Sequence, residues 1–175
     1  SAWATTIVPL ADPGLVARSP LVFTGRVEGT LPASDPGPYT DWLVTVERVL
    51  KGELAECAIV VRVLGGETAE GGQLIIHGAP SFAEREQVLL FLAPRPDGTF
   101  RIAQYLQGAF HAVHAQGRQF AAQDLSEVRV VMRSMRARRA ARAMRDLELF
   151  ATWIEDRVAG ARREPDYLVR PSREG

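Results

Sequence analysis

The sequence predicts a mainly β protein, in which a small antiparallel β-barrel is followed by a long C-terminal helix. Short apolar or β-branched runs recur at even spacing between Gly-rich turns, which is typical of barrels and sandwiches. Residues 87–92 form an uncharged run between a Glu/Arg turn and Pro94, and predict a central strand buried on both faces. The character of the sequence changes at Asp124, where a helical pattern begins.

The composition is that of a globular protein with a core of its own. Hydrophobic residues make up 46% of the 175-residue chain and charged residues 24%. A chain of this length can bury a hydrophobic core without support from disulfides or metal ions. The lone Cys57 excludes an internal disulfide framework. No apolar run approaches the length of a membrane span.

Charge is distributed unevenly along the chain, although the formal net charge is zero. Residues 1–125 carry 9 Lys+Arg against 13 Asp+Glu, whereas residues 126–175 carry 12 against 8. We therefore expect the two regions to attract each other, or the basic region to meet an acidic partner.

Local signals place the first elements in order. Residues 1–10 are apolar and β-branched, and predict an edge strand or a loose arm. Residues 12–18 predict a short helix with Asp12 as its N-cap and Pro13 at the first helical position. Residues 29–38 are rich in Pro, Gly, Ser and Asp, and predict a loop.

The strands are expected between these turn signals. The clearest alternation falls in residues 42–50, where Trp42, Val44 and Val46 share one face. Pro96-Asp97-Gly98 indicates a hairpin directly after the central strand. The expected strands cover residues 21–28, 42–50, 57–64, 73–77, 87–92, 100–106, 109–114 and 119–121.

Helix is expected directly after the barrel, because Asp124-x-x-Glu127 has the form of a capping box. Two apolar stripes follow, and they would lie about 110° apart on one continuous helix. The first stripe consists of Val128, Val131, Met132 and Met135, and the second of Met144, Leu147, Ala151, Ile154, Val158 and Ala161. Either the helix breaks near residues 137–140, or its first part packs against a different surface. The expected units are a barrel domain at 1–123, a helical segment at 124–162 and a flexible tail or linker at 163–175.

No constellation of catalytic or metal-binding residues stands out. His111 and His114 have metal-like spacing for a helix, but in a strand residues three apart point to opposite faces. Cys57 begins an apolar strand, which favours a buried structural cysteine over a reactive thiol. The chain shows no nucleophile elbow, phosphate loop or acid–base pair. The sequence thus predicts a protein that is not an enzyme, with no catalytic residue, metal or cofactor.

A cluster of arginines in the expected helix is the main candidate binding feature. Beside a small barrel it suggests binding to single-stranded nucleic acid or another polyanion, whereas the structural alternative is a solvated helix face or one docked on the acidic barrel. Two aromatic residues on the flank of the second stripe are candidates for contact with a partner. The candidate binding residues are Arg129, Arg133, Arg136, Arg138, Arg139, Arg142, Arg145, Phe150 and Trp153.

Segments in a fixed order carry a resemblance to a known family: residues 21–27, 40–52, 60–66, 78–82 leading into 86–92, and 107–110. Over about residues 10–125 the chain resembles the non-catalytic N-terminal domain of exported bacterial proteins, often found ahead of a matrixin-type zinc metalloprotease domain. The resemblance implies a five-stranded barrel similar to the oligonucleotide-binding (OB) fold and to netrin-like and metalloprotease-inhibitor domains.

The chain departs from that family in one turn. Ala83-Glu84-Arg85 stands before the central strand, where the family usually has Gly. The metalloprotease zinc helix H-E-x-x-H-x-x-G-x-x-H is also missing from the sequence, so a protease domain would have to lie beyond Gly175.

The resemblance implies a non-catalytic accessory domain that binds, and so regulates or positions, a metalloprotease domain. Its expected partner is a protein or an adjacent domain, and its expected location is secreted or in the cell envelope. The chain starts at Ser1 without Met, which indicates a processed product whose signal peptide would lie upstream. Binding of single-stranded nucleic acid or a polyanion through the Arg-rich helix is the alternative, and the oligomeric state stays open.

Overall fold

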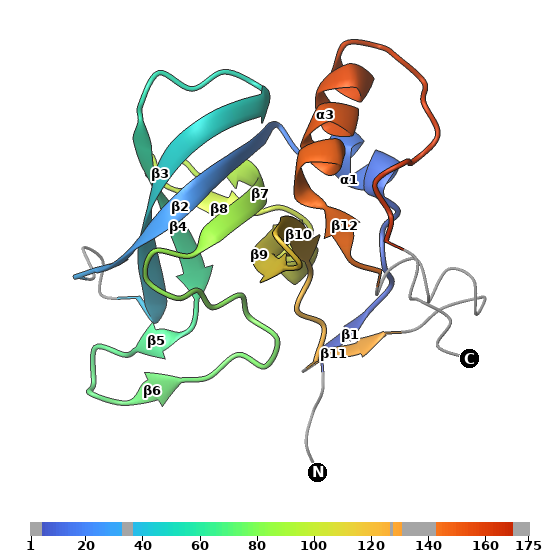
Figure 1. Cartoon of the computed structure of the whole chain (residues 1–175). Coiled ribbons are helices and arrows are strands. Elements are labelled where there is room, and N and C mark those ends of the chain that lie inside the picture. The colour runs from blue at the N-terminus through green and yellow to red at the C-terminus, as the bar shows by residue number, and fades with distance from the viewer. Residues whose placement is uncertain (1–4, 33–36, 127, 131–142, 170–175) are drawn as a thin grey trace.

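The computed structural model describes residues 5–32, 37–126, 128–130 and 143–169, and shows a mainly β fold with a C-terminal helix (Figure 1). Five strands form a closed barrel in the order β7-β2-β3-β4-β8, with β8 pairing back onto β7. The barrel strands are β2 (Leu21–Leu31), β3 (Tyr39–Lys51), β4 (Ala58–Leu64), β7 (Gln87–Pro94) and β8 (Phe100–Ile102).

The barrel is mixed, whereas the sequence predicted an antiparallel one. The β4–β8 pair is parallel, with Val61 opposite Phe100, and the other barrel pairs are antiparallel. A closed ring with an odd number of strands cannot alternate direction at every pairing, so at least one pair must be parallel.

Within the part of the chain that the structure describes, further strands and three helical segments surround the barrel. Strands β9, β10 and β12 extend the sheet from β7, while β1 pairs in parallel with β11 and β5 pairs with β6. These strands are β1 (Thr5–Ile7), β5 (Gly66–Glu67), β6 (Gln73–Leu74), β9 (Ala109–Ala115), β10 (Arg118–Ala122), β11 (Val128–Val130) and β12 (Arg145–Asp146). The helical segments are α1 (Asp12–Arg18), a 3-10 helix (Tyr105–Gly108) and α3 (Leu147–Val158). No helix among the described residues is long and apolar enough to cross a membrane.

The prediction for the central strand is confirmed. Strand β7 pairs with β2, β8 and β9, and residues 88–92 are buried on both faces. Successive side chains of a strand point to opposite faces, so β7 contributes side chains to two separate cores. Val88, Leu90 and Leu92 enter one core, while Leu89 and Phe91 enter the other.

The two cores lie on opposite faces of β7. The barrel core is formed mainly by barrel-strand side chains, among them Phe23, Val27, Val44, Ile59, Val61 and Leu90. The outer core lies on the other face of β7 and contains residues of α1 and α3, which lie on the same side of the barrel (Figure 1). Its buried side chains include Leu15, Leu89, Phe91, Phe110, Phe150, Trp153, Ile154 and Tyr167.

Helix α1 has the predicted bounds, Asp12–Arg18, but Asp12 has another role than expected. Ala11 is the N-cap, and Asp12 lies inside the first turn. Its buried carboxylate accepts hydrogen bonds from the Arg145 guanidinium at 2.8 and 2.9 Å and from the Tyr167 hydroxyl at 2.7 Å. The residue predicted as a helix cap therefore joins the two ends of the chain.

The prediction of helix directly after Asp124 is wrong for the residues described there. The Asp124 carboxylate accepts bonds from the backbone N–H and hydroxyl of Ser126, at 3.0 and 2.7 Å, and so forms an Asx-type turn instead of a cap. The β-branched segment Val128–Val130 then pairs with β1 as a strand. Residues 131–142, with the expected break near 137–140, lie outside the described residues.

Helix α3 begins at Leu147 and covers the chain's own sheet. Asp146 is its N-cap and accepts a hydrogen bond from the Leu149 N–H at 3.0 Å. Its buried face is formed by Phe150, Ala151, Trp153 and Ile154. The helical part of the predicted segment therefore packs on the barrel's outer face.

Several local predictions need smaller corrections. The strand expected at 73–77 is only the two-residue β6, and the one at 100–106 ends at Ile102 and gives way to the 3-10 helix. Cys57 is exposed, so the prediction of a buried cysteine is wrong. It precedes β4, whose inward side chains begin with Ile59.

Candidate functional site

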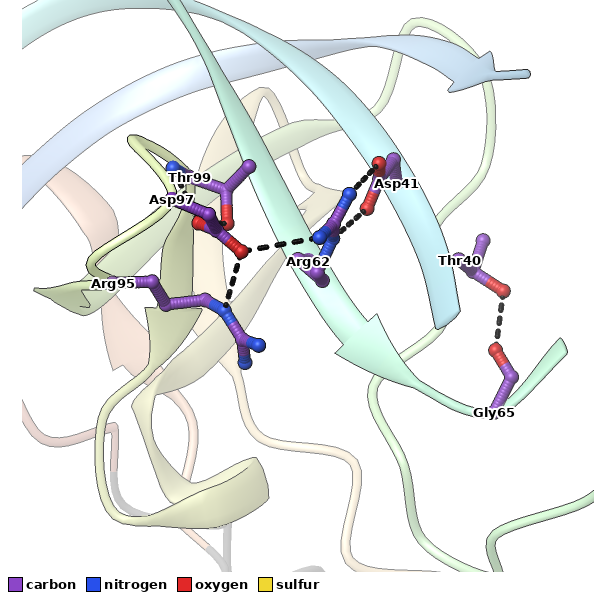
Figure 2. Close-up of polar contacts among 7 residues, drawn as sticks. All are labelled: Thr40, Asp41, Arg62, Gly65, Arg95, Asp97 and Thr99. Atoms are coloured by element: carbon purple, nitrogen blue, oxygen red, sulfur yellow. Dashed lines mark hydrogen bonds and ion pairs between the residues drawn. The ribbon is translucent and has the colours of Figure 1, made fainter. Parts of the chain in front are cut away.

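A charged network joins the outer face of β3 and β4 to the β7–β8 hairpin (Figure 2). Its centre is Arg62, which lies directly opposite Asp41 in the antiparallel register of β4 and β3. The Arg62 Nε and Nη2 atoms each donate to a different Asp41 oxygen at 2.8 Å. The two side chains are only 4% and 5% exposed. A buried charge pair needs such two-point geometry, because removing charges from water is costly.

The hairpin tip supplies the second carboxylate of this network. Asp97 accepts a hydrogen bond from Arg62 Nη1 at 3.1 Å and another from Arg95 Nε at 3.4 Å. Its other oxygen accepts bonds from the Thr99 hydroxyl at 2.6 Å and the Thr99 N–H at 2.9 Å. These Thr99 bonds, together with Arg95, lower the pKa of Asp97 to about 2. The predicted Pro-Asp-Gly hairpin is confirmed, with Gly98 at φ +83°.

The side chain of Arg95 leaves part of its guanidinium available. Asp97 engages only the Nε atom, and Figure 2 shows the terminal nitrogens of Arg95 directed away from that carboxylate. The Arg95 guanidinium lies 5.2 Å from the centre of the Tyr39 ring, and that of Arg62 lies 5.4 Å from it. Arg95 is therefore held in position while its terminal donors stay free of the ion pair.

A pocket of about 350 Å³ lies beside this network, between the end of β4, segment 76–80, β8 and the 3-10 helix. We call it the β4–β8 pocket. Its polar lining includes Arg62, Arg95, Arg101, His77 and Tyr105. Its apolar lining includes Val63, Leu64, Ile76, Pro80, Ile102 and Leu106. The pocket thus combines an apolar surface with a group of guanidinium ions.

The rim of the β4–β8 pocket carries an unusual backbone conformation. Gln104 and Tyr105 have positive φ values of 53° and 63°, a region that non-glycine residues rarely occupy. The Tyr105 side chain is 74% exposed although it is aromatic. The turn into the 3-10 helix therefore presents Tyr105 at the rim of the pocket.

A second, adjoining pocket of about 260 Å³ is lined by Trp42 and shares residues 63, 64, 76, 79 and 80 with the first. The Trp42 Nε1 atom is buried and has no acceptor among the described residues. Such an unsatisfied donor costs about 1–3 kcal/mol. Because this N–H does not reach the pocket surface, we assign it no ligand.

The turn before the central strand shows how the chain compensates for the missing glycine. Arg85 adopts φ +65°, the left-handed conformation that glycine takes most easily. Glu86 then accepts hydrogen bonds from the Ala83 N–H at 2.7 Å and from His111 Nδ1 at 2.5 Å. Burial alone would raise the pKa of Glu86, but these two hydrogen bonds outweigh it and hold the pKa below its ordinary value.

The two histidines of the H-x-x-H motif do not converge. His111 bonds to Glu86, whereas the His114 ring lies 2.9 Å from the Gln119 side-chain amide. Both histidines lie on β9, three residues apart, and so point to opposite faces of the sheet. Among the described residues, no three or more His, Cys, Asp or Glu side chains are grouped for a metal ion.

The structure places three of the candidate binding residues inside the fold. Arg145 is 3% exposed, pairs with Asp12, and lies 4.9 Å from the centre of the Phe110 ring. Phe150 and Trp153 are fully buried in the outer core. Arg129 lies in β11, and no side chain is described for it. Outside the described residues lie Arg133, Arg136, Arg138, Arg139 and Arg142.

The residues around the β4–β8 pocket were not among the candidates from sequence. One usable signal was present, since Arg62 breaks an otherwise apolar strand and faces away from Ile59, Val61 and Val63. Its partner Asp41 stands near the start of β3, directly before the apolar residues Trp42, Leu43 and Val44. A charge inside each of two neighbouring strands is a pattern that predicts a cross-strand ion pair.

Comparison with known proteins identifies no family. No protein-family model matches the chain. No curated protein matches it either. What the structure supports is a small five-stranded β-barrel with extra strands and a C-terminal helix.

Proposed function

We propose that this chain is a non-catalytic binding domain of an exported bacterial protein, and that its partner docks at the β4–β8 pocket. The observation that carries the proposal is the apolar pocket with Arg62, Arg95 and Arg101 in its lining and the exposed Tyr105 at its rim. Tyrosine and arginine are enriched at protein interfaces, and apolar pockets with a few fixed polar groups are the usual form of binding sites.

The charges of the pocket suit recognition better than proton transfer. Arginine keeps its proton at any accessible pH, so these side chains act as fixed donors and positive charges. The network around Asp97 fixes the Arg95 side chain before any partner arrives. Such preorganisation raises affinity by reducing the conformational entropy lost on binding.

The partner that the sequence favours is a metalloprotease domain. This part of the proposal rests on the resemblance over residues 10–125 to the N-terminal domain of exported bacterial metalloprotease-like proteins. The five-stranded barrel agrees with the fold which that resemblance implies. In this role the domain binds the catalytic domain and regulates or positions it, in a secreted protein or at the cell envelope.

The test is binding to the catalytic domain of a matrixin-type metalloprotease, with peptide hydrolysis measured in parallel. We expect micromolar or tighter binding by calorimetry, and at least about tenfold weaker binding for the double variant Arg95→Glu/Arg101→Glu. Arg18→Glu is the matched control, since Arg18 is an exposed arginine outside the pocket lining. Equal loss in the control variant, or no binding at micromolar concentration, would remove the metalloprotease as partner.

The alternative partner is a single-stranded nucleic acid or another polyanion, bound by the arginines between 129 and 145. The one described side chain of that cluster, Arg145, is buried against Asp12, which leaves it no role at the surface. Salt-dependent binding of an oligonucleotide without binding of the protease would favour this alternative.

A further inference from the structure

We infer that the β4–β8 pocket binds a peptide through a carboxylate and the aliphatic side chain beside it, as at the C-terminus of a chain ending in leucine. This inference rests on the proposed binding function and names the ligand chemistry of the same pocket. It combines three observations: the apolar lining, the guanidinium donors still available, and the scarcity of aromatic residues.

The apolar lining defines the aliphatic part of the ligand. Val63 and Leu64 come from the end of β4, Ile76 from the following segment, and Ile102 and Leu106 from the far side. Burying an aliphatic side chain against such a surface is favourable by the hydrophobic effect. A pocket of about 350 Å³ is at the small end of ligand sites, which suits one or two residues of a peptide.

The remaining donors define the charged part of the ligand. Arg62 is committed to Asp41 and Asp97, but Arg95 uses only its Nε atom in the ion pair. Arg101 is exposed and forms no ion pair within the described part of the chain. A planar guanidinium matches a carboxylate with two parallel hydrogen bonds, which makes Arg95 and Arg101 the anion-binding groups.

The neighbouring carboxylates do not cancel this attraction. Asp41 is paired with Arg62, and both oxygens of Asp97 already accept hydrogen bonds. The described residues that line the pocket include Arg62, Arg95 and Arg101, and none of them is Asp or Glu. An incoming carboxylate therefore meets a net positive site.

The lining favours a peptide over a nucleic acid. Single-stranded nucleic acids bind on successive aromatic side chains, onto which their bases stack. Tyr105 is the one Phe, Trp or Tyr that lines the β4–β8 pocket among the described residues. The aliphatic side chains of the lining cannot replace the aromatic rings on which the bases of a nucleic acid would stack.

The experiment is an NMR titration of the ¹⁵N-labelled full chain with three probes. N-acetyl-L-leucine carries both the carboxylate and the aliphatic group, N-acetyl-L-leucine amide lacks the charge, and N-acetylglycine lacks the side chain. We expect saturable shifts of the amides of Leu64, Arg101 and Ile102 with N-acetyl-L-leucine. Each of the other two probes should bind about tenfold more weakly.

Matched variants locate the binding groups. Arg101→Gln should weaken N-acetyl-L-leucine binding about tenfold, because it removes one charged hydrogen-bond donor from an exposed position. Arg18→Gln, at an exposed position in α1, should leave the binding unchanged. Equal binding of the acid and the amide would overturn the inference, and so would an equal effect of the two variants.

Two further arms separate this inference from its rivals. Inorganic phosphate or a thymidine oligonucleotide that shifts the same amides as strongly would make the pocket a general anion site and overturn the peptide assignment. If the metalloprotease domain binds at the pocket while N-acetyl-L-leucine does not, only the ligand chemistry fails. If the probe binds and the protease does not, only the proposed partner fails.

Discussion

The barrel core and the outer core share strand β7, but different kinds of contacts hold them together. The barrel core is formed by hydrophobic side chains, most of them from strands that alternate inward and outward, and the Trp42 side chain packed against it carries a buried N–H with no acceptor among the described residues. The outer core gathers aromatic rings from β7, β9, α3 and the C-terminal segment around a buried ion pair. Its charged link between Asp12 and Arg145 spans 133 positions of the chain.

The difference shows two ways of specifying a hydrophobic layer. The barrel depends on a repeating pattern, so many side chains share the same role and each one is a modest part of it. The outer layer depends on a few polar contacts that join distant segments, with Asp12 accepting from both Arg145 and Tyr167. A buried charge without its partner is far more costly than a lost methyl group. Substitutions should therefore affect the two layers unequally.

The largest effect is expected from Asp12→Ala. The substitution leaves the Arg145 guanidinium buried without its carboxylate, and should lower the free energy of unfolding by about 3–5 kcal/mol. Chemical denaturation followed by circular dichroism measures the change. The double variant Asp12→Ala/Arg145→Met removes both charges and should recover part of the loss. A cost below about 1 kcal/mol for Asp12→Ala would show that the outer layer does not depend on the pair.

The next largest effects are expected from two neighbours on β7. Leu89→Ala and Leu90→Ala each open a cavity at a fully buried position and should each cost about 2–5 kcal/mol. Leu89 faces the outer core and Leu90 the barrel core. Hydrogen exchange should therefore accelerate first in α3 for Leu89→Ala, and first in β3 and β4 for Leu90→Ala. The same exchange pattern in both variants would contradict two separate cores.

The smallest effect is expected from Tyr167→Phe, which removes the hydroxyl bonded to Asp12 and should cost about 1–3 kcal/mol. Burial, with the nearby Asp12, raises the pKa of Tyr167 above its ordinary value. The folded state thus keeps this proton when the unfolded state, with a tyrosine pKa of about 10, loses it. Stability should fall above about pH 10 in the wild type, and less in Tyr167→Phe. Equal pH dependence in urea denaturation of the two proteins would exclude Tyr167 as the cause.

Local patterns in the sequence predicted the barrel well. The bounds of α1, the buried strand at 87–92 and the Pro-Asp-Gly hairpin follow from short-range rules on capping, alternation and turns. The parallel β4–β8 pair was missed, because it depends on how the ring closes and not on either strand alone.

The outer layer and the candidate site were not predictable in the same way. Arg145 was grouped with neighbouring arginines, since nothing nearby in the sequence indicates a partner 133 positions away. The capping-box pattern at Asp124 also matches an Asx turn, and the β-branched residues after it decide between the two. The site around Arg62 could be predicted only from the register of β3 and β4, because this register places Asp41 opposite Arg62.

The odd number of barrel strands has a mechanical consequence at the parallel junction. Strand β4 is registered with β8 only through Val61 and Phe100, whereas β8 is registered with β7 at three positions. The junction of β4 and β8 is thus the joint of the cylinder with the least backbone pairing, and the first expected to open in local fluctuations. Leu64 lies just past this joint on one side, with Arg101 and Ile102 on the other, and all three line the β4–β8 pocket. A ligand that contacts both sides of the β4–β8 junction would stabilise the closed barrel at the position where its backbone pairing is weakest.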